Sequence, residues 1–237
     1  MSVSLSWQQV KGMLENNGYT IARHKFTSNY LKNILDIDTV IDIGVGHGTP
    51  PLHDKEIASN FVLIDPQPVP PPVVEMIESF GGTVHCFQTA LGDQREERTF
   101  YVHANMNHSN LHQHTSTFSK LESAQASEAT TPVVPLDDLL EENKLELGRY
   151  AVKIDTEGSE LAVIRGATKT LRNAAFVLIE TSVKRRFQGA YKPSAIIAEL
   201  AQLGLEPADF LNISLKTPWY IDILFAPWSS DIFDVPK

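Results

Sequence analysis

The sequence has little cysteine and no long apolar run. Cys86 is the single cysteine among 237 residues. One cysteine cannot form a disulfide within the chain, and it excludes a zinc site built from several thiolates. No uncharged apolar stretch approaches the length that spans a bilayer. We therefore expect neither a disulfide framework nor membrane insertion.

Basic residues are also too few for a protein that binds nucleic acid through its phosphates. The chain has 20 Lys and Arg against 29 Asp and Glu, a net charge of −9 with histidine neutral. A phosphate-backbone binder needs a basic face, so we expect no nucleic-acid partner. The segment from Met1 to Trp7 lacks the basic and apolar regions of a secretory signal, and we therefore expect a cytoplasmic protein.

What the chain does have is enough apolar content for one large core. Hydrophobic residues make up 42% of it, and its length lies between one typical domain and two. We expect a single domain over residues 1–237. Its expected parts are a helical extension at 1–38, an α/β core at 39–227 and a tail at 228–237.

Short apolar runs alternate with helical patterns along most of the chain. Five runs have the character of strands buried on both faces: 39–43, 61–65, 83–87, 150–155 and 176–180. The expected helices cover 6–17, 28–35, 72–80, 159–171 and 194–203. Two late runs, 209–213 and 220–225, have no helix between them. The pattern predicts a doubly wound, mostly parallel α/β sheet with an antiparallel edge hairpin and N-terminal helices.

Glycines alternate with other residues directly after the first expected strand, in Gly44-Val-Gly-His-Gly48. Glycine lets the backbone turn tightly and approach a ligand closely. Asp65 ends the next strand, where a carboxylate can accept the hydroxyls of a ribose. Together these features favour an adenosyl nucleoside at the C-terminal edge of the sheet. The glycines alone also fit a strand–helix turn without a ligand.

The charge beside this turn distinguishes two adenosyl cofactors. Asp42 would repel the pyrophosphate of NAD, but it suits a cationic sulfonium with an α-amino group. The glycine spacing also differs from the G-x-G-x-x-G of a pyrophosphate-binding turn. We therefore predict S-adenosylmethionine as the cofactor. For Asp42 alone, bracing of the turn is the alternative role.

A second group of charged residues, Lys153-Ile-Asp-Thr-Glu-Gly-Ser-Glu160, ends the fourth expected strand. Lys153 and Asp155 leave the strand on one face, and their burial requires pairing or a functional site. Asp155 and Glu157 stand where ligands of open α/β sheets bind. Glu160 falls in the first turn of the next helix, where the helix dipole favours a negative charge.

These motifs and several others follow one another in a characteristic order. The segments are Val40 to Gly48, Leu63 to Pro66, Ala90 to Asp93, Pro135 to Leu139, Lys153 to Leu161, Arg165 to Ala167 and Leu178 to Glu180. In this order they resemble the FkbM-type S-adenosylmethionine-dependent methyltransferases, over roughly residues 39–205. The resemblance implies a class I methyltransferase (Rossmann-like) fold. It also implies O-methylation of a sugar, a glycan or a hydroxylated metabolite.

The resemblance further implies roles for individual residues. Asp42, Gly44 and Gly46 would line the methionine part of the cofactor, and Asp65 its ribose. The other residues expected at the cofactor are Pro66, Ala90, Leu91, Ser109 and Asp155. Many relatives have Asn in place of Gly46 and no double proline such as Pro50-Pro51. The start of the first core helix is therefore expected to differ here.

Residues 99–135 break the alternation, because a strand-like run at 99–103 precedes a long polar stretch. Such stretches are typically functional or mobile. Its histidines are His103, His108, His112 and His114. They could ligate a transition metal, or the stretch could be a solvated loop. The resembling family has a recurring serine here, matched by Ser109, which favours a lid that contacts the cofactor or the acceptor.

Methyl transfer to a hydroxyl is helped by a group that accepts its proton. The candidate bases are Asp155, Glu157 and His108. Asp155, Glu157 and Glu180 come from neighbouring strand ends and would repel one another without a cation. A divalent ion such as Mg²⁺ bound by these three carboxylates is one interpretation. The other is an Asp155–Lys153 pair, with Glu180 capping a loop.

Two other function classes fit parts of the sequence. A nicotinamide-dependent oxidoreductase is disfavoured because no Tyr-x-x-x-Lys pair follows the fourth strand. A binding module without catalysis would be expected to lack the strand-end acids. The triplet Lys184-Arg-Arg186 is expected in a solvated loop near the acceptor. A homo-oligomer could form through Trp7 in the N-terminal helix and through Trp219 and Trp228 near the C-terminus.

Overall fold

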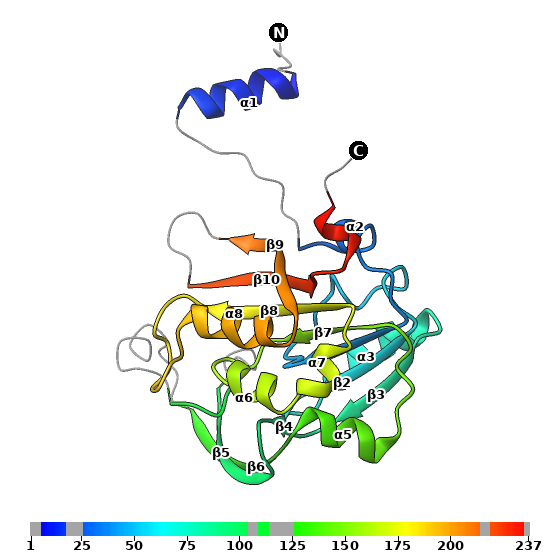
Figure 1. The fold of residues 1–237 in the computed structure, drawn as a ribbon, viewed down its shortest axis with the longest axis vertical. Coiled ribbons are helices and arrows are strands. Elements are labelled where there is room, and N and C mark those ends of the chain that lie inside the picture. The colour runs from blue at the N-terminus through cyan, green and yellow to red at the C-terminus, as the bar shows by residue number, and fades with distance from the viewer. Residues whose placement is uncertain (1–5, 18–25, 104–108, 114–125, 214–218, 235–237) are drawn as a thin grey trace.

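The computed structural model describes residues 6–17, 26–103, 109–113, 126–213 and 219–234. Its main feature is a seven-stranded sheet with the order β3-β2-β1-β7-β8-β10-β9 (Figure 1). The strands are β1 (Thr39–Ile43), β2 (Asn60–Ile64), β3 (Thr83–Phe87), β7 (Tyr150–Ile154), β8 (Phe176–Ser182), β9 (Leu205–Ile213) and β10 (Tyr220–Pro227). All pairs are parallel except those that β10 makes with β8 and β9. The predicted α/β fold and its antiparallel edge hairpin are confirmed.

Helices cover both faces of this sheet. The covering helices are α2 (Ser28–Leu31), α3 (Pro71–Ser79), α5 (Leu136–Asn143), α6 (Glu160–Arg165), α7 (Thr168–Arg172) and α8 (Pro193–Gln202). The described residues also form α1 (Trp7–Asn16) and a short 3-10 helix at Asp231–Phe233. Ile41 and Val152 belong to the core layer formed with α5 to α8, whereas Val40 and Ala151 belong to the layer formed with α2 and α3. Because neighbouring strand residues face opposite layers, β1 is buried along its whole length. The expectation of burial on both faces was wrong for residues 83–87, because β3 lies at the sheet edge and is mostly exposed.

A three-stranded sheet is an element that the sequence analysis did not predict. It consists of β4 (Ala90–Leu91), β5 (Glu96–Val102) and β6 (Ser127–Val134), in the order β4-β6-β5. Strand β6 is mostly exposed and polar and contains Pro132. Its sequence therefore has neither the apolar run nor the clear alternation that indicates a strand. The strand-like run expected at 99–103 overlaps β5, but β4 and β6 were not expected.

The amphipathic stretch 159–171 forms two helices, α6 and α7, rather than one. Gly166 ends α6, and a Cβ at this position would lie 1.9 Å from the carbonyl oxygen of Gly92. This close approach to the turn after β4 requires glycine. Near the N-terminus, helix α2 ends at Leu31 rather than at the predicted Leu35.

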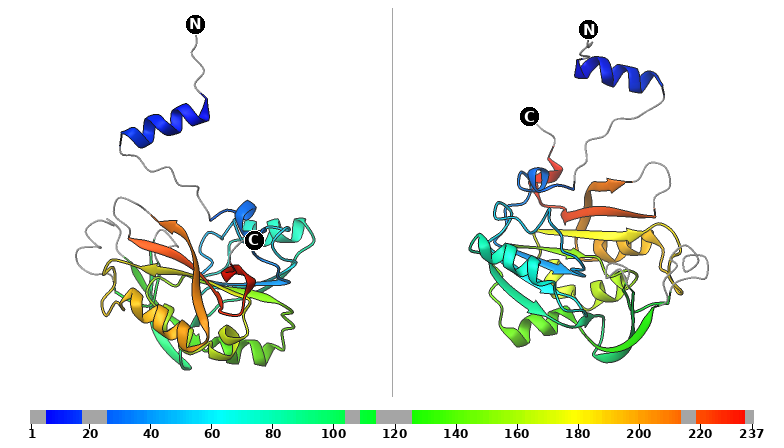
Figure 2. Two further views of the ribbon diagram at one scale, coloured as in Figure 1. Left: turned by 45° about the horizontal axis from the view of Figure 1, so that its top comes forward. Right: turned by 180° about the vertical axis from the view of Figure 1, so that it is seen from behind.

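Helix α1 begins as predicted, with Ser6 as its N-cap. The Ser6 side chain accepts from the Gln9 amide, and the Gln9 side chain accepts from the Ser6 amide. This reciprocal capping box satisfies two backbone donors of the first turn. All three views draw α1 apart from the sheet and its covering helices (Figures 1 and 2). No helix in the described ranges has the length and apolar content needed to cross a bilayer.

Candidate functional site

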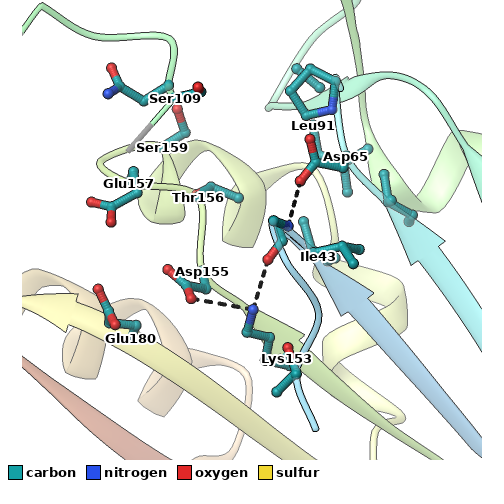
Figure 3. Close-up of a pocket in the computed structure, with 18 of the residues that line it drawn as sticks. Ile43, Asp65, Leu91, Ser109, Lys153, Asp155, Thr156, Glu157, Ser159 and Glu180 are labelled. Carbon is teal, nitrogen blue, oxygen red and sulfur yellow. Dashed lines mark hydrogen bonds and ion pairs between the residues drawn. The ribbon is translucent and has the colours of Figure 1, made fainter. Parts of the chain in front are cut away.

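A cavity of about 360 Å³ opens at the C-terminal ends of β1, β2, β7 and β8. Ligands of open α/β sheets bind at this edge, and the volume suits a small molecule. Figure 3 shows the polar side chains around it. Of the residues predicted to bind the cofactor, those that line the cavity are Gly44, Gly46, Asp65, Pro66, Ala90, Leu91, Ser109 and Asp155.

The glycine turn after β1 passes directly against the end of β7. Gly44 has a φ of +80°, and a Cβ there would lie 1.7 Å from the carbonyl oxygen of Asp155. Only glycine fits both this left-handed backbone and this contact. The Asp155 amide also donates to the carbonyl oxygen of Ile43 at 2.9 Å. The ends of β1 and β7 therefore form one continuous floor of the cavity.

Asp65 lies in the cavity wall and holds the glycine turn. Its Oδ2 accepts from the Gly46 amide at 3.0 Å, and its Oδ1 accepts from the Gln67 amide at 2.8 Å. Burial raises the pKa of Asp65, while the two amides favour its charged form. Because a carboxylate oxygen has two lone pairs, each can also accept a hydrogen bond from a ligand hydroxyl.

Asp42 does not line the cavity, although the sequence analysis placed it at the cofactor. Its side chain is fully buried, and its Oδ2 lies 2.8 Å from Nε2 of His53. Burial raises the pKa of Asp42, but Lys153 and then His53 outweigh this and lower it to about 2. Its place along the strand is the reason: Asp42 lies two residues before Gly44, and Lys153 and His53 enclose its carboxylate below the turn. This position fits the alternative role of a brace for the turn.

Lys153 joins three groups below the cavity floor. Its Nζ donates to the carbonyl oxygen of Gly44 at 2.7 Å and lies 3.3 Å from a carboxylate oxygen of Asp155 (Figure 3). It also lies 3.2 Å from a carboxylate oxygen of Asp42. Burial opposes the charge of this amine, but the two carboxylates raise the pKa of Lys153 above its usual value. The predicted Asp155–Lys153 pair is therefore present.

Three carboxylates meet on the opposite side of the cavity. One oxygen each of Asp155, Glu157 and Glu180 lies within 4.8 Å of the others. Burial raises the pKa of Glu157 to about 8 and that of Glu180 to about 10, and the charge of Asp155 adds to both shifts. A nearby arginine, Arg186, opposes the rise in pKa of both glutamates.

Arg186 reaches into this group of carboxylates. Its Nη1 lies 2.8 Å from Glu157 Oε2, and its Nη2 lies 3.3 Å from Glu180 Oε1. The prediction of a solvated loop was wrong for this residue, because its side chain is only 6% exposed. The segment after β8 places Arg186 in the cavity lining, and a run of three charged residues in the sequence does not reveal which one becomes buried. Glu180 likewise pairs with Arg186, a partner that the sequence analysis did not identify.

Glu160 closes the turn between β7 and α6. Its carboxylate accepts from the amides of Thr156 and Gly158 at 3.1 Å and 3.0 Å and from the Tyr191 hydroxyl at 2.5 Å. It lies in the first turn of α6, as predicted. Between the two bonded amides, Glu157 has a φ of +51°, which is strained for a residue with a side chain. The turn thus holds Glu157 at the cavity.

Two of the four histidines in the polar segment, His108 and His114, lie outside the described residues. The role of His108 as a base therefore stays a prediction. The backbone amide of His103 donates to Ser109 Oγ at 3.0 Å. Ser109 is thus hydrogen-bonded to the residue that follows β5, and it also lines the cavity, where the lid was expected.

His112 lies behind the turn that carries Glu157. Its Nε2 is 3.2 Å from Ser159 Oγ, and burial lowers the pKa of His112. In the described part of the chain, the three carboxylates are the one group whose spacing could hold a metal ion, and no histidine belongs to it. A histidine metal site is therefore absent from the described residues.

The sequence analysis missed His53, Tyr220 and Asp222 as well as Arg186. Tyr220 and Asp222, from β10, line the cavity beside Glu180. A signal for Asp222 was present, because an aspartate interrupts the apolar run 220–225 as Lys153 interrupts its own strand. Nothing comparable marks His53, whose partner Asp42 lies on another element.

The raised pKa values of the two glutamates predict a pH-dependent stability. Because the pKa of Glu180 rises from 4.5 to about 10 on folding, the folded chain binds more protons than the unfolded chain between these values. Stability should fall as pH rises there, by up to about 1.4 kcal/mol per pH unit for each proton. We expect Glu180→Gln to reduce this slope in urea unfolding between about pH 5 and about pH 8. The exposed Glu141→Gln is the control, and a Glu180→Gln slope equal to that of the wild type would contradict the prediction.

Comparison with known proteins gives one family match. A sequence model of the methyltransferase FkbM domain matches residues 42–207. No curated protein matches the chain. A Burkholderia thailandensis 1,6-didemethyltoxoflavin-N1-methyltransferase, solved with bound S-adenosylhomocysteine, has 9% identity and a TM-score of 0.45, with 96% of this chain and 93% of that chain covered.

Two further solved structures show likenesses of similar size. An S-adenosylmethionine-dependent methyltransferase from Clostridium acetobutylicum has 10% identity and a TM-score of 0.41, with 93% of this chain and 97% of that chain covered. A protein of the NADB-Rossmann superfamily from Streptococcus agalactiae has 8% identity and a TM-score of 0.43, with 88% and 69% covered. We draw no conclusion about function from likenesses of this size.

Proposed function

Because this chain belongs to the FkbM methyltransferase family, we propose that it transfers a methyl group from S-adenosylmethionine to a hydroxyl of a sugar, a glycan or a hydroxylated metabolite. The family makes the chain a methyltransferase, and the donor and the acceptor are the proposal. One observation carries it. A single cavity has the glycine turn and Asp65 on one side and the carboxylates of Asp155, Glu157 and Glu180 on the other.

The side of the cavity with the glycine turn suits the methyl donor. S-adenosylmethionine supplies an electrophilic methyl group on a cationic sulfonium. Asp65 can accept hydrogen bonds from the ribose hydroxyls, and Ile43 and Leu91 form an apolar part of the cavity wall. Asp155 places a carboxylate beside the turn, where a neighbouring negative charge favours a cation.

The other side suits an acceptor with hydroxyl groups. Glu157, Glu180 and Asp222 offer carboxyl groups there, and Tyr220 adds an aromatic ring. Carboxylates accept hydrogen bonds from hydroxyls, and a hydroxyl bonded in this way is held in one orientation. Orientation is the main contribution that a protein makes to an in-line displacement.

Proton transfer completes the reaction. The acceptor oxygen forms a bond to the methyl carbon as the sulfur–methyl bond breaks, and the hydroxyl proton passes to a carboxylate. Asp155 and Glu157, which both line the cavity, are the candidates to receive it, and the pKa of Glu157, about 8, lies near neutral pH, where a general base is efficient. His108 is a third candidate for this role.

A divalent ion was the alternative expectation at Asp155, Glu157 and Glu180. The spacing of the three oxygens suits an ion, but Arg186 already pairs with two of the three carboxylates. The residues present therefore do not fit a resident divalent ion, and the proposed reaction uses none.

Titration calorimetry tests the proposed donor. We expect the protein to bind S-adenosylhomocysteine and not NAD⁺, and Asp65→Ala to weaken S-adenosylhomocysteine binding at least about tenfold, since a carboxylate–hydroxyl contact and the brace of the Gly46 amide are both lost. Asp36→Ala is the matched control, because the Asp36 side chain is 99% exposed. Binding of NAD⁺, or equal affinities for the Asp65→Ala variant and the wild type, would refute the assignment.

A labelled-methyl screen tests the proposed acceptor. The protein is incubated with methyl-labelled S-adenosylmethionine and a panel of sugars, glycosides and phenolic metabolites, and products are identified by mass. We expect label in an ether that resists mild base. Label found only in an ester or an amine would show that the acceptor class is wrong, while leaving the donor in place.

A further inference from the structure

Arg186 is a buried cation that bridges elements far apart in the sequence. It pairs with Glu157 after β7 and with Glu180 in β8, at 2.8 Å and 3.3 Å. Its Nε and Nη2 also donate to Ser182 Oγ at 3.0 Å and 2.8 Å, and its Cζ lies 5.8 Å from the centre of the Tyr220 ring. The planar guanidinium suits such a bridge, because its donors diverge in fixed directions.

The charges around the cavity show why a cation is needed at this position. The carboxyl groups that line it on this side are Asp155, Glu157, Glu180 and Asp222. Among the described residues that line the cavity, Lys153 and Arg186 carry positive charge. Lys153 is shared with Asp42 below the floor. The cation in contact with Glu157 and Glu180 is therefore Arg186.

The three carboxylate oxygens that lie within 4.8 Å of one another have a spacing that a divalent ion with oxygen ligands could use. Two of these carboxylates already hold the guanidinium, one on each terminal nitrogen. A metal ion and Arg186 would then compete for the same oxygens, and two adjacent cations would repel each other.

We propose that Arg186 takes the place of a divalent ion in this site, as a positioning residue that holds Glu157 and Glu180 side by side at the acceptor. The proposal rests on the proposed function for the identity of the acceptor side. It has a consequence that a merely structural role would not have. Removal of the guanidinium should leave a group of carboxylates that can bind a metal ion.

Manganese binding tests this consequence. We titrate the full chain with MnCl₂ alone and follow bound Mn²⁺ by electron paramagnetic resonance and calorimetry. We expect Arg186→Met to bind one Mn²⁺ with a Kd of about 10⁻⁴ to 10⁻³ M, and the wild type to bind at least about tenfold more weakly. Adding Glu180→Gln to Arg186→Met should abolish the binding, which assigns the ion to this group.

The controls keep the result interpretable. Arg165→Met removes an exposed arginine that pairs with Glu199 at 2.6 Å, and it should create no Mn²⁺ site. Thermal unfolding checks that each variant is folded, and Arg186→Gln replaces Arg186→Met if the latter is not. Specific Mn²⁺ binding by the wild type that Glu180→Gln removes would overturn the proposal. Failure of both folded Arg186 variants to bind Mn²⁺ would also overturn it.

S-adenosylhomocysteine titrations on the same samples separate this proposal from the proposed function. If the wild type fails to bind S-adenosylhomocysteine but the Mn²⁺ results follow the expectation, the donor assignment fails and the role of Arg186 in balancing charge stands. If S-adenosylhomocysteine binds and the wild type also binds Mn²⁺ at this group, the donor assignment stands and Arg186 is not the substitute for an ion.

Discussion

Replacing Gly44 with alanine is expected to lower the affinity for S-adenosylhomocysteine at least about 100-fold, which corresponds to about 2.7 kcal/mol. The added Cβ would lie 1.7 Å from the carbonyl oxygen of Asp155, which is backbone and cannot rotate away. The ends of β1 and β7 would have to separate, and with them the floor of the cavity. Calorimetric titration of the folded variant measures the loss.

Gly81 is the control that separates the effect of the Cβ contact from the effect of the left-handed backbone angle. Gly81 has a φ of +85°, close to that of Gly44, but a Cβ at Gly81 would meet nothing within 4 Å. Gly81→Ala should therefore cost only the strain of a left-handed alanine, about 1–2 kcal/mol of stability, and leave binding unchanged. Comparable binding by the Gly44→Ala variant and the wild type would show that the turn does not form the ligand site.

Replacing Lys153 with methionine is expected to destabilise the fold by about 3–5 kcal/mol, because it leaves the fully buried Asp42 without its cation. The carbonyl oxygen of Gly44 also loses its donor, and Asp155 loses the partner that holds it at the cavity floor. We expect a melting temperature lower by roughly 10 °C, together with weaker S-adenosylhomocysteine binding. Urea unfolding and calorimetry measure the two effects.

The surface pair of Lys169 and Glu141 provides the matched control. Lys169 is 73% exposed and lies 3.6 Å from Glu141, so Lys169→Met should change stability by less than about 1 kcal/mol. Adding Asp42→Asn to Lys153→Met removes the uncompensated charge and should recover part of the loss. No recovery in the double variant, or a Lys153→Met variant as stable as the wild type, would show that the buried pair does not hold the floor.

The sequence predicted the parallel core because each of its strands carries its own signal. Residues 83–87 form β3 with the expected bounds, although this edge strand is mostly exposed. Residues 39–43 form β1 with the expected bounds, and all five are buried. A strand buried on both faces must be apolar along its length, whatever its neighbours are. By contrast, β6 forms a strand through its hydrogen bonds to β4 and β5, and its own sequence has little apolar signal.

The residues of the candidate site show the same difference between local sequence signal and pairing between elements. Gly44 and Asp65 were expected at the ligand edge of the sheet, and both line the cavity, because the local pattern shows their positions at strand ends. Asp42 was expected at the cofactor, but Lys153 and His53 enclose its carboxylate below the cavity. Arg186 was expected in solvent, but it is buried. The pairing of Arg186 with Glu157 depends on the path of the segment after β8, and no local pattern specifies that path.

The amino-acid sequence by itself determined the strands of the seven-stranded sheet, the glycine turn and the acids at the strand ends, because these follow from the period of apolar residues and from backbone angles that few residues tolerate. Only the tertiary structure decided which acids face the cavity and which cation balances each of them. Charges at separate strand ends become neighbours when the sheet is assembled, and burial then makes each charge depend on its partner.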